Sequence, residues 1–144
     1  MVRLFEFGDL DAIMKIWLEG NLKSHSFIPD SYWKGNYDSV KSVLPNAEVY
    51  VHETGGEVDG FIGIDADYIE GIFVAADSQR RGIGHQLIEK VKKEKERLSL
   101  HVYRKNKQAI RFYEKEGFRI EKELTEKENR EPEYLMVYAV SDAV

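Results

Sequence analysis

The sequence contains no cysteine among its 144 residues. This absence excludes disulfide bonds, metal sites built on thiolates and catalysis by a cysteine nucleophile, and it fits the reducing cytosol, so we expect a cytoplasmic protein. The sequence also lacks any apolar run near the roughly 20 residues that a membrane-spanning helix needs. The first residues, Arg3-Leu4-Phe5-Glu6, do not have the pattern of a secretory signal. We therefore expect no membrane association.

Positive charge is not in excess either. Lys and Arg number 21 against 26 Asp and Glu, which gives a formal net charge of -5. Because nonspecific binding to nucleic acid needs a basic face, we expect no nucleic-acid partner. A hydrophobic content of 42% and a charged content of 33% are ordinary for a folded chain. The length fits one domain, 1–144, without repeats, low-complexity tracts or linkers.

The most informative stretch runs from Phe73 to Leu87. β-type residues continue to Val74, a polar turn follows, and from Gly84 onward the apolar residues repeat with helical spacing. The turn carries two arginines and two glycines: Arg80, Arg81, Gly82 and Gly84. Free backbone N–H groups and the positive end of the helix dipole favour an anion at such a helix start, and glycine lets a phosphate approach the backbone closely. The stretch therefore predicts a phosphate-binding loop.

Spacing separates three kinds of phosphate loop. A Walker A loop is missing from the sequence, and Gly82-Ile83-Gly84 lacks the third glycine of a dinucleotide fingerprint. The run Gln79-Arg80-Arg81-Gly82-Ile83-Gly84 instead resembles the Gln/Arg-x-x-Gly-x-Gly/Ala loop of the GNAT acetyltransferase superfamily, which holds the pyrophosphate of acetyl-CoA. The segment from Asn106 to Phe118 resembles that family's Asn-x-x-Ala-x-x-Phe-Tyr-x-x-x-Gly-Phe pattern. Two motifs in the right order make the resemblance specific over residues 72–118.

The predicted elements alternate in the order β-α-α-β-β-β-α-β-α-β-β, an α/β (α+β) pattern. They comprise strands at 2–7, 48–53, 58–65, 68–74, 98–103, 118–123 and 134–140, a helix from Leu10 with Asp9 as its N-cap, a loop over 21–30, and helices at 33–44, 82–97 and 106–116. Resemblance to the GNAT fold implies a mixed, mostly antiparallel sheet of about seven strands with helices on both faces. It also implies that the strands at 68–74 and 98–103 splay apart and that the pantetheine arm of acetyl-CoA lies between them, hydrogen-bonded to the backbone near Val74.

The resemblance implies acetyl-CoA as co-substrate and no metal. The residues expected to contact acetyl-CoA are Phe73, Val74, Gln79, Arg80, Arg81, Gly82, Ile83, Gly84 and Asn106.

Acetyl transfer from a thioester to an amine requires a neutral amine and a proton for the departing thiolate. An alkylammonium with a pKa of about 10.4 is neutral to only about one part in 2,000 at pH 7, so a base is needed. Tyr113 stands at the position of the family's general acid, and a phenol with a pKa of about 10 can protonate a thiolate of about 8.5. Outside that motif, Tyr113 would be interpreted as a buried aromatic residue.

Glu70 is the predicted general base, because relatives often carry Glu or His on the strand that enters the phosphate loop. In a regular strand Glu70 and Ile72 point to one face, so only a β-bulge would turn Glu70 away from the side that Ile72 buries. Otherwise Glu70 is a structural carboxylate. Tyr68 and His101 are alternative bases and candidate acceptor contacts.

We therefore predict an N-acetyltransferase that moves an acetyl group from acetyl-CoA to a primary amine. Without cysteine, direct attack in a ternary complex is favoured over a covalent acyl-enzyme. The predicted acceptor is a small-molecule amine, and a protein or peptide amine, N-terminal or lysine, is the alternative. A non-catalytic acyl-CoA-binding module is the alternative class. His25 and Phe27 are candidate acceptor contacts or residues that cover the core edge, and we expect a monomer or homodimer.

Overall fold

The structure is a computed structural model and describes residues 1–140. Within these residues a seven-stranded sheet has the order β1-β2-β3-β4-β5-β7-β6. The strands are β1 Val2–Leu4, β2 Glu48–Thr54, β3 Glu57–Asp65, β4 Tyr68–Val74, β5 Arg97–Tyr103, β6 Arg119–Thr125 and β7 Pro132–Ala139. The helices are α1 Leu10–Ser24, α2 Asp30–Val43, α3 Ile83–Lys92 and α4 Lys107–Lys115, with 3₁₀ turns η1 Phe7–Asp9, η2 Leu44–Asn46 and η3 Ala76–Ser78. The predicted order of elements is confirmed.

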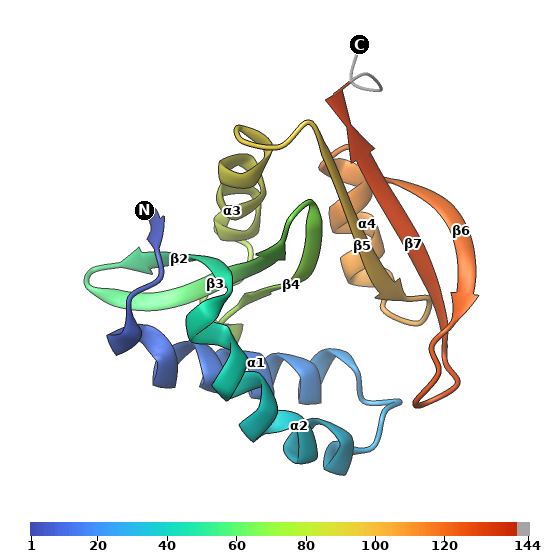
Figure 1. The fold of residues 1–144 in the computed structure, drawn as a ribbon, viewed down its shortest axis with the longest axis horizontal. Coiled ribbons are helices and arrows are strands. Elements are labelled where there is room, and N and C mark those ends of the chain that lie inside the picture. Colours follow the sequence, from blue (N-terminus) through green and yellow to red (C-terminus); the bar gives the residue numbers. More distant parts are fainter. Residues whose placement is uncertain (141–144) are drawn as a thin grey trace.

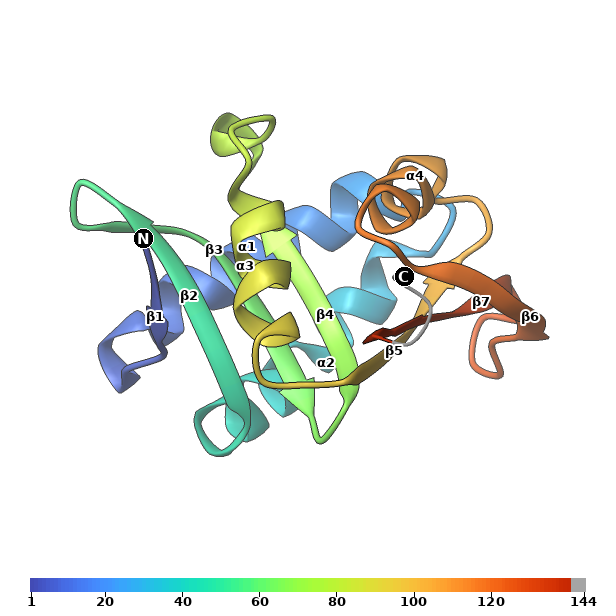
Figure 2. The same ribbon diagram turned by 90° about the horizontal axis from the view of Figure 1, so that it is seen from above.

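All neighbouring strands run antiparallel except β4 and β5, which run parallel. The sheet is therefore mixed and mostly antiparallel, as predicted. Helices α1 and α2 lie on one face, and α3 and α4 lie on the other (Figures 1 and 2). Figure 2 also shows β4 and β5 diverging, which divides the sheet into two wings.

Strand β3 is buried on both faces because each face of the sheet has its own helix layer. Ile62 packs in one core with Leu87 of α3. Phe61, the preceding residue, packs in the other core with Ile13 of α1. Two separate cores thus hold the helix that follows the phosphate loop and the helices on the opposite face to the same strand.

The β2–β3 hairpin forms at the predicted place. Gly55 and Gly56 make the turn with φ angles of +60° and +85°, which glycine adopts without the clash that a Cβ would cause.

Three predictions about the N-terminal third were wrong. The loop expected from residue 21 is helical as far as Ser24, because Asn21 is buried and its amide donates to the Trp17 carbonyl, 2.9 Å away. Asp9 precedes α1, yet its carboxylate makes no capping bond to that helix. It instead accepts two hydrogen bonds from Arg3, at 2.9 and 3.0 Å, and one from the Glu6 backbone N–H. The turn that this arrangement stabilises ends the first strand at Leu4 rather than at residue 7.

Helix α3 ends at Lys92, five residues before the predicted end at 97. Sheet pairing overrides the helical pattern there, since β5 pairs with β7 from Arg97 onward and the Glu96 carbonyl accepts from the Val140 N–H. Between residues 1 and 140, no helix has the length and apolar character needed to cross a membrane.

Candidate active site

The predicted phosphate loop joins β4 to α3 with a backbone suited to an anion. Gly82 precedes the helix with φ +78° and ψ 11°, a left-handed conformation, and Arg80 has φ +66°. The first rung of α3 runs from the Gln86 N–H to the Gly82 carbonyl, at 3.0 Å. The N–H groups of residues 83–85 precede that rung and are therefore available to a ligand at the positive end of the helix. A Cβ added at Gly82 would meet no atom within 4 Å, so its backbone conformation, and not crowding, requires glycine.

The second glycine of the loop serves a different purpose. A Cβ on Gly84 would lie 3.1 Å from the Phe112 ring, so the absence of a side chain lets α3 approach α4. Next to it, His85 Nδ1 lies 2.9 Å from both carboxylate oxygens of Glu116, the residue that follows α4. These contacts fix the phosphate loop relative to the helix that carries Tyr113.

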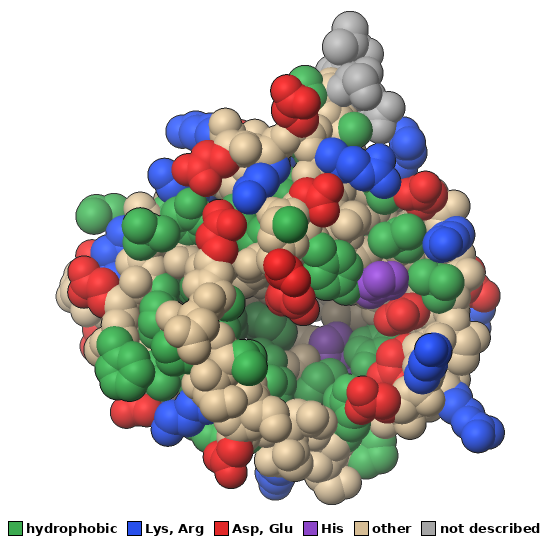
Figure 3. Space-filling model, in the orientation of Figure 1, with side chains coloured by type: hydrophobic (Ala, Val, Ile, Leu, Met, Phe, Trp, Pro, Cys, Tyr) green, Lys and Arg blue, Asp and Glu red, His purple; other side chains and the backbone are tan. Residues whose placement is uncertain are grey.

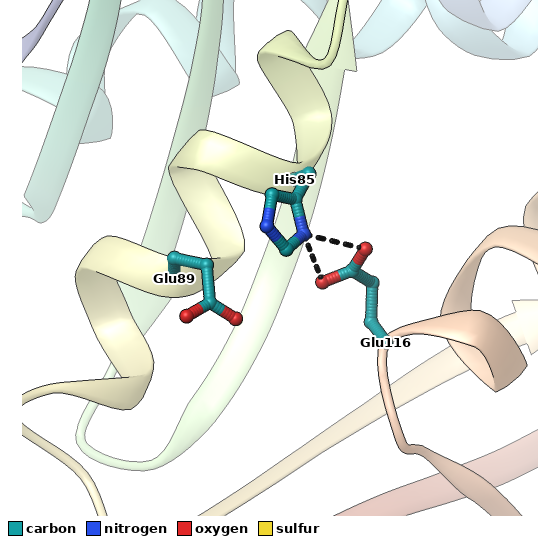
Figure 4. A group of neighbouring side chains, drawn as sticks. All are labelled: His85, Glu89 and Glu116. Carbon is teal, nitrogen blue, oxygen red and sulfur yellow. Dashed lines mark hydrogen bonds and ion pairs between the residues drawn. The ribbon is translucent and has the colours of Figure 1, made fainter.

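His85, Glu89 and Glu116 also have the composition of a metal site, and their ligand atoms lie within 4.8 Å of one another (Figure 4). However, the Lys92 ammonium lies 3.6 Å from the Glu89 carboxylate and 4.0 Å from the Glu116 carboxylate. A positive charge therefore already stands beside both carboxylates. We assign the cluster to an ion-pair network between α3 and α4.

The predicted splay between β4 and β5 is confirmed. The two strands share a single paired position, Tyr68 with Ser99, next to a hydrogen bond of 3.0 Å from the Ser99 N–H to the Asp67 carbonyl. Beyond it, β4 continues to pair only with β3 and β5 only with β7. The facing edges of both strands are thus open to a ligand, as β-augmentation requires.

The end of β4 leads directly into the loop. The Phe73 ring stacks on Phe61 with centroids 5.4 Å apart, and it lies close to Gly20 of α1. This packing places the Phe73 ring against β3 and α1, so the predicted contact of Phe73 with acetyl-CoA falls to its backbone. Gln79 donates its side-chain amide to the Val74 carbonyl at 3.2 Å, which ties the loop back to the strand.

Glu70 lies at a β-bulge, the feature on which its predicted role depends. Gly63 pairs with Gly71, but Ile64 pairs with Ile69, which leaves Glu70 as the extra residue. Ile69 and Ile72 therefore both pack toward α3, and Glu70 is exposed instead of sharing the buried face of Ile72. Although Glu70 is exposed as a residue, partial desolvation of its carboxyl first, and the charge of Asp65 second, raise the pKa of that carboxyl above its usual value.

Tyr113 lies on α4, 7% exposed, with its ring against Phe112 and Phe118. Burial, and after it the proximity of Tyr68, raises the pKa of its phenol well above the usual value. The phenol is therefore protonated at neutral pH, the form that a general acid requires.

Tyr68 and His101 bridge the start of the gap from β4 to β5. The Tyr68 hydroxyl and His101 Nδ1 are 2.7 Å apart. Burial, followed by the charges of Glu70 and Glu133, raises the pKa of Tyr68 to about 12. The phenol therefore keeps its proton at neutral pH, and the tautomer of His101 sets which of the two groups donates.

His25 and Phe27 belong to an aromatic cluster between the α1–α2 connection and β5. The His25 ring lies 5.0 Å from Tyr103 and 5.4 Å from Trp33, and Phe27 lies 5.4 Å from Tyr103. Burial lowers the pKa of His25 to about 4, so its ring is neutral at pH 7. The cluster therefore packs the α1–α2 connection against the end of β5.

His25 and Asn106 hydrogen-bond to each other. Asn106 Oδ1 accepts from the Ala109 N–H at 3.2 Å, which makes Asn106 the N-cap of α4, and its Nδ2 lies 3.1 Å from His25 Nε2. His25 Nδ1 in turn lies 2.9 Å from the Asn21 side-chain oxygen. The predicted cofactor contact Asn106 and the predicted acceptor contact His25 thus form one link between α1 and α4.

The space-filling view, which has the orientation of Figure 1, shows a hollow near the centre of the molecule, in the region of the gap between β4 and β5 (Figure 3). Asp, Glu and hydrophobic side chains border it, and a His side chain lies inside it.

Glu133 was not among the site residues predicted from the sequence; it lies opposite Tyr103 in the β5–β7 ladder. A single sequence carries no signal for that strand register.

These features agree with a family match. Residues 45–120 match the family described as Acetyltransferase (GNAT) domain. The chain belongs to this family and is an acetyl-CoA-dependent N-acetyltransferase.

Individual relatives extend the match to nearly the whole chain. The chain is 35% identical over 142 residues to Peptidyl-lysine N-acetyltransferase YiaC of Escherichia coli (strain K12), covering 97% of each protein. It is 29% identical over 112 residues, or 76% of each chain, to Peptidyl-lysine N-acetyltransferase YjaB of the same strain.

Solved structures share the fold. The apo form of YjaB from Escherichia coli aligns with a TM-score of 0.85 at 23% identity, covering 96% of each chain. The PaiA N-acetyltransferase of Thermoplasma acidophilum, determined in complex with coenzyme A, aligns with a TM-score of 0.77 at 19% identity, covering 96% of this chain and 98% of that chain.

Proposed function

We propose that the protein acetylates the ε-amino group of lysine in a peptide or protein, by direct attack of the amine on acetyl-CoA in a ternary complex. The observation that carries this proposal is the 35% identity, over 97% of both chains, to a protein named a peptidyl-lysine N-acetyltransferase. Carboxylates around the gap, among them Glu70 and Glu133, supply negative potential suited to a cationic side chain. The small-molecule amine expected from the sequence is the competing acceptor.

In this proposal the loop from Gln79 to Gly84 binds the pyrophosphate of acetyl-CoA. Its exposed N–H groups and its two arginines, Arg80 and Arg81, complement the negative charge. The pantetheine arm then extends along the open edge of β4 beside Val74. This placement brings the thioester toward Tyr113 and Glu70.

The proposed reaction moves protons through two side chains. Glu70 takes a proton from the lysine ammonium, and the neutral amine attacks the thioester carbonyl. The tetrahedral intermediate collapses as the C–S bond breaks, Tyr113 protonates the thiolate, and the nitrogen loses its second proton, which restores Tyr113. The net products are the acetylated amine, coenzyme A and one proton.

The acceptor class is tested by measuring free thiol from acetyl-CoA with matched amines. We expect a peptide with a blocked N-terminus and one lysine to give kcat/KM at least about tenfold above polyamines, amino acids and aminoglycosides, a difference of about 1.4 kcal/mol. The same peptide with arginine in place of lysine is the control and should release no thiol above background. Preference for a small amine would contradict the peptide proposal and support the prediction from sequence.

Glu70→Gln tests the base. At saturating acceptor, we expect kcat to fall by about 10²–10⁴ near neutral pH and to recover as rising pH supplies neutral amine. In the wild type, activity should fall as pH decreases through the raised pKa of Glu70, because the protonated carboxyl cannot accept a proton. Asp67→Asn, a neutralisation in the adjacent turn, is the matched control and should leave the profile unchanged. A loss that is equal at every pH would mean that Glu70 has only a structural role.

A further inference from the structure

Two carboxylates beside the gap form no ion pair with Lys or Arg among residues 1–140. Neither Glu70 nor Glu133 forms an ion pair or a side-chain hydrogen bond within this part of the chain. Neighbouring carboxylates differ: Glu131 pairs with Lys105 and Glu123 with Arg104, each at 3.1 Å. Arg104 and Lys105, which follow β5, are therefore already paired with other carboxylates.

Both unpaired carboxylates act on the same group. The charges of Glu70 and Glu133 each raise the pKa of Tyr68, which holds His101 at 2.7 Å. Glu70 comes from the bulge of β4, whereas Glu133 comes from β7, which is paired with β5. The two side chains thus belong to opposite wings of the sheet and converge on the Tyr68–His101 bridge.

The register of β7 determines which way Glu133 points. Glu133 is directly opposite Tyr103, and residues directly opposite in an antiparallel pair project to the same face of the sheet. Tyr103 contacts His25 and Phe27 on that face. Glu133 therefore lies on the side of the aromatic cluster and is half-buried. Burial raises the pKa of the Glu133 carboxyl and the charge of His101 opposes that shift, so a cation that pairs with the carboxylate offsets the cost of its burial.

We propose that Glu133 is the specificity residue for a positively charged acceptor, and that it binds the ammonium form of the incoming amine across the gap from Glu70. The aromatic cluster contacts the methylenes that lead to the ammonium. In this assignment Glu133 pairs with the ammonium and Glu70 takes the proton, so one residue provides affinity and the other reactivity. This inference rests on the proposed function, because it requires an amine acceptor at the same site.

The two roles predict opposite kinetic effects. Glu133→Gln should raise the KM for a lysine peptide by about 10- to 100-fold, as expected for losing a hydrogen bond between charged groups, and should change kcat by less than about threefold. Glu70→Gln should instead lower kcat. Glu123→Gln removes a carboxylate from the neighbouring strand β6, and this control should leave both constants unchanged.

A binding measurement tests Glu133 without turnover. In the presence of coenzyme A, which carries no acetyl group, calorimetry compares a lysine peptide with its norleucine counterpart, which lacks the ammonium. The wild type should bind the lysine peptide at least about tenfold more tightly, and Glu133→Gln should remove that preference while still binding norleucine. If Glu133→Gln keeps the preference, or weakens both peptides equally, the inference is overturned. If the wild type acetylates no amine at all, the proposed function fails instead.

Discussion

Tyr113→Phe is expected to lower kcat by about 10²–10⁴, or about 3–5 kcal/mol of transition-state stabilisation. The variant keeps the ring that packs against Phe112 and Phe118, so stability and affinity for acetyl-CoA should change little. It loses the buried, protonated hydroxyl that would donate to the departing thiolate. Steady-state thiol release with acetyl-CoA varied at saturating amine measures both constants.

The leaving group provides the control for this variant. An acyl donor whose thiol is more acidic needs less help from an acid, so the deficit of Tyr113→Phe should shrink with such a donor. Near-full turnover with acetyl-CoA, or a loss confined to acetyl-CoA affinity, would place the general acid elsewhere.

Gly82→Val is expected to abolish the stabilisation that acetyl-CoA gives the wild type. At a ligand concentration of 100 times Kd, mass action stabilises a protein by about 2.7 kcal/mol, which a thermal melt detects as a higher Tm. A branched side chain at φ +78° strains the loop and blocks the approach of a phosphate to the backbone. The Tm of the variant should therefore no longer respond to acetyl-CoA.

The β2–β3 hairpin supplies a matched control. Gly56 has φ +85°, and a Cβ there also meets nothing within 4 Å, so Gly56→Val imposes comparable strain away from the gap. Gly56→Val should lower the Tm of the free protein to a similar extent but keep the response to acetyl-CoA. Unchanged acetyl-CoA affinity in folded Gly82→Val protein would contradict the loop assignment.

Local patterns predicted the features that depend on neighbouring residues. The glycines of the loop determine its backbone conformation, and the second motif identifies Tyr113 and the helix that carries it. Both could therefore be found from the sequence. The splay followed from resemblance and not from the residues of β4 or β5. The helical extension to Ser24 could not be predicted, because it depends on the buried side chain of Asn21.

Features that depend on strand register could not be predicted from the sequence. Glu70 was predicted as a base only on condition of a bulge, and the bulge appears only in the pairing of β3 with β4. Glu133 was missed because its place beside the gap follows from its pairing with Tyr103, about 30 residues away along the chain. The link from His25 to Asn106 likewise joins elements distant in sequence.

A crystal structure of the protein with acetyl-CoA and a lysine peptide is the most direct test of the proposed site and acceptor. We expect the pyrophosphate within hydrogen-bond distance of the backbone N–H groups of residues 79–84, with the pantetheine along the open edge of β4 at Val74. We also expect the Tyr113 hydroxyl within about 3.5 Å of the thioester sulfur and the lysine nitrogen beside Glu70. A thioester bound outside the gap between β4 and β5, or a sulfur distant from Tyr113 in the occupied site, would contradict the proposed site.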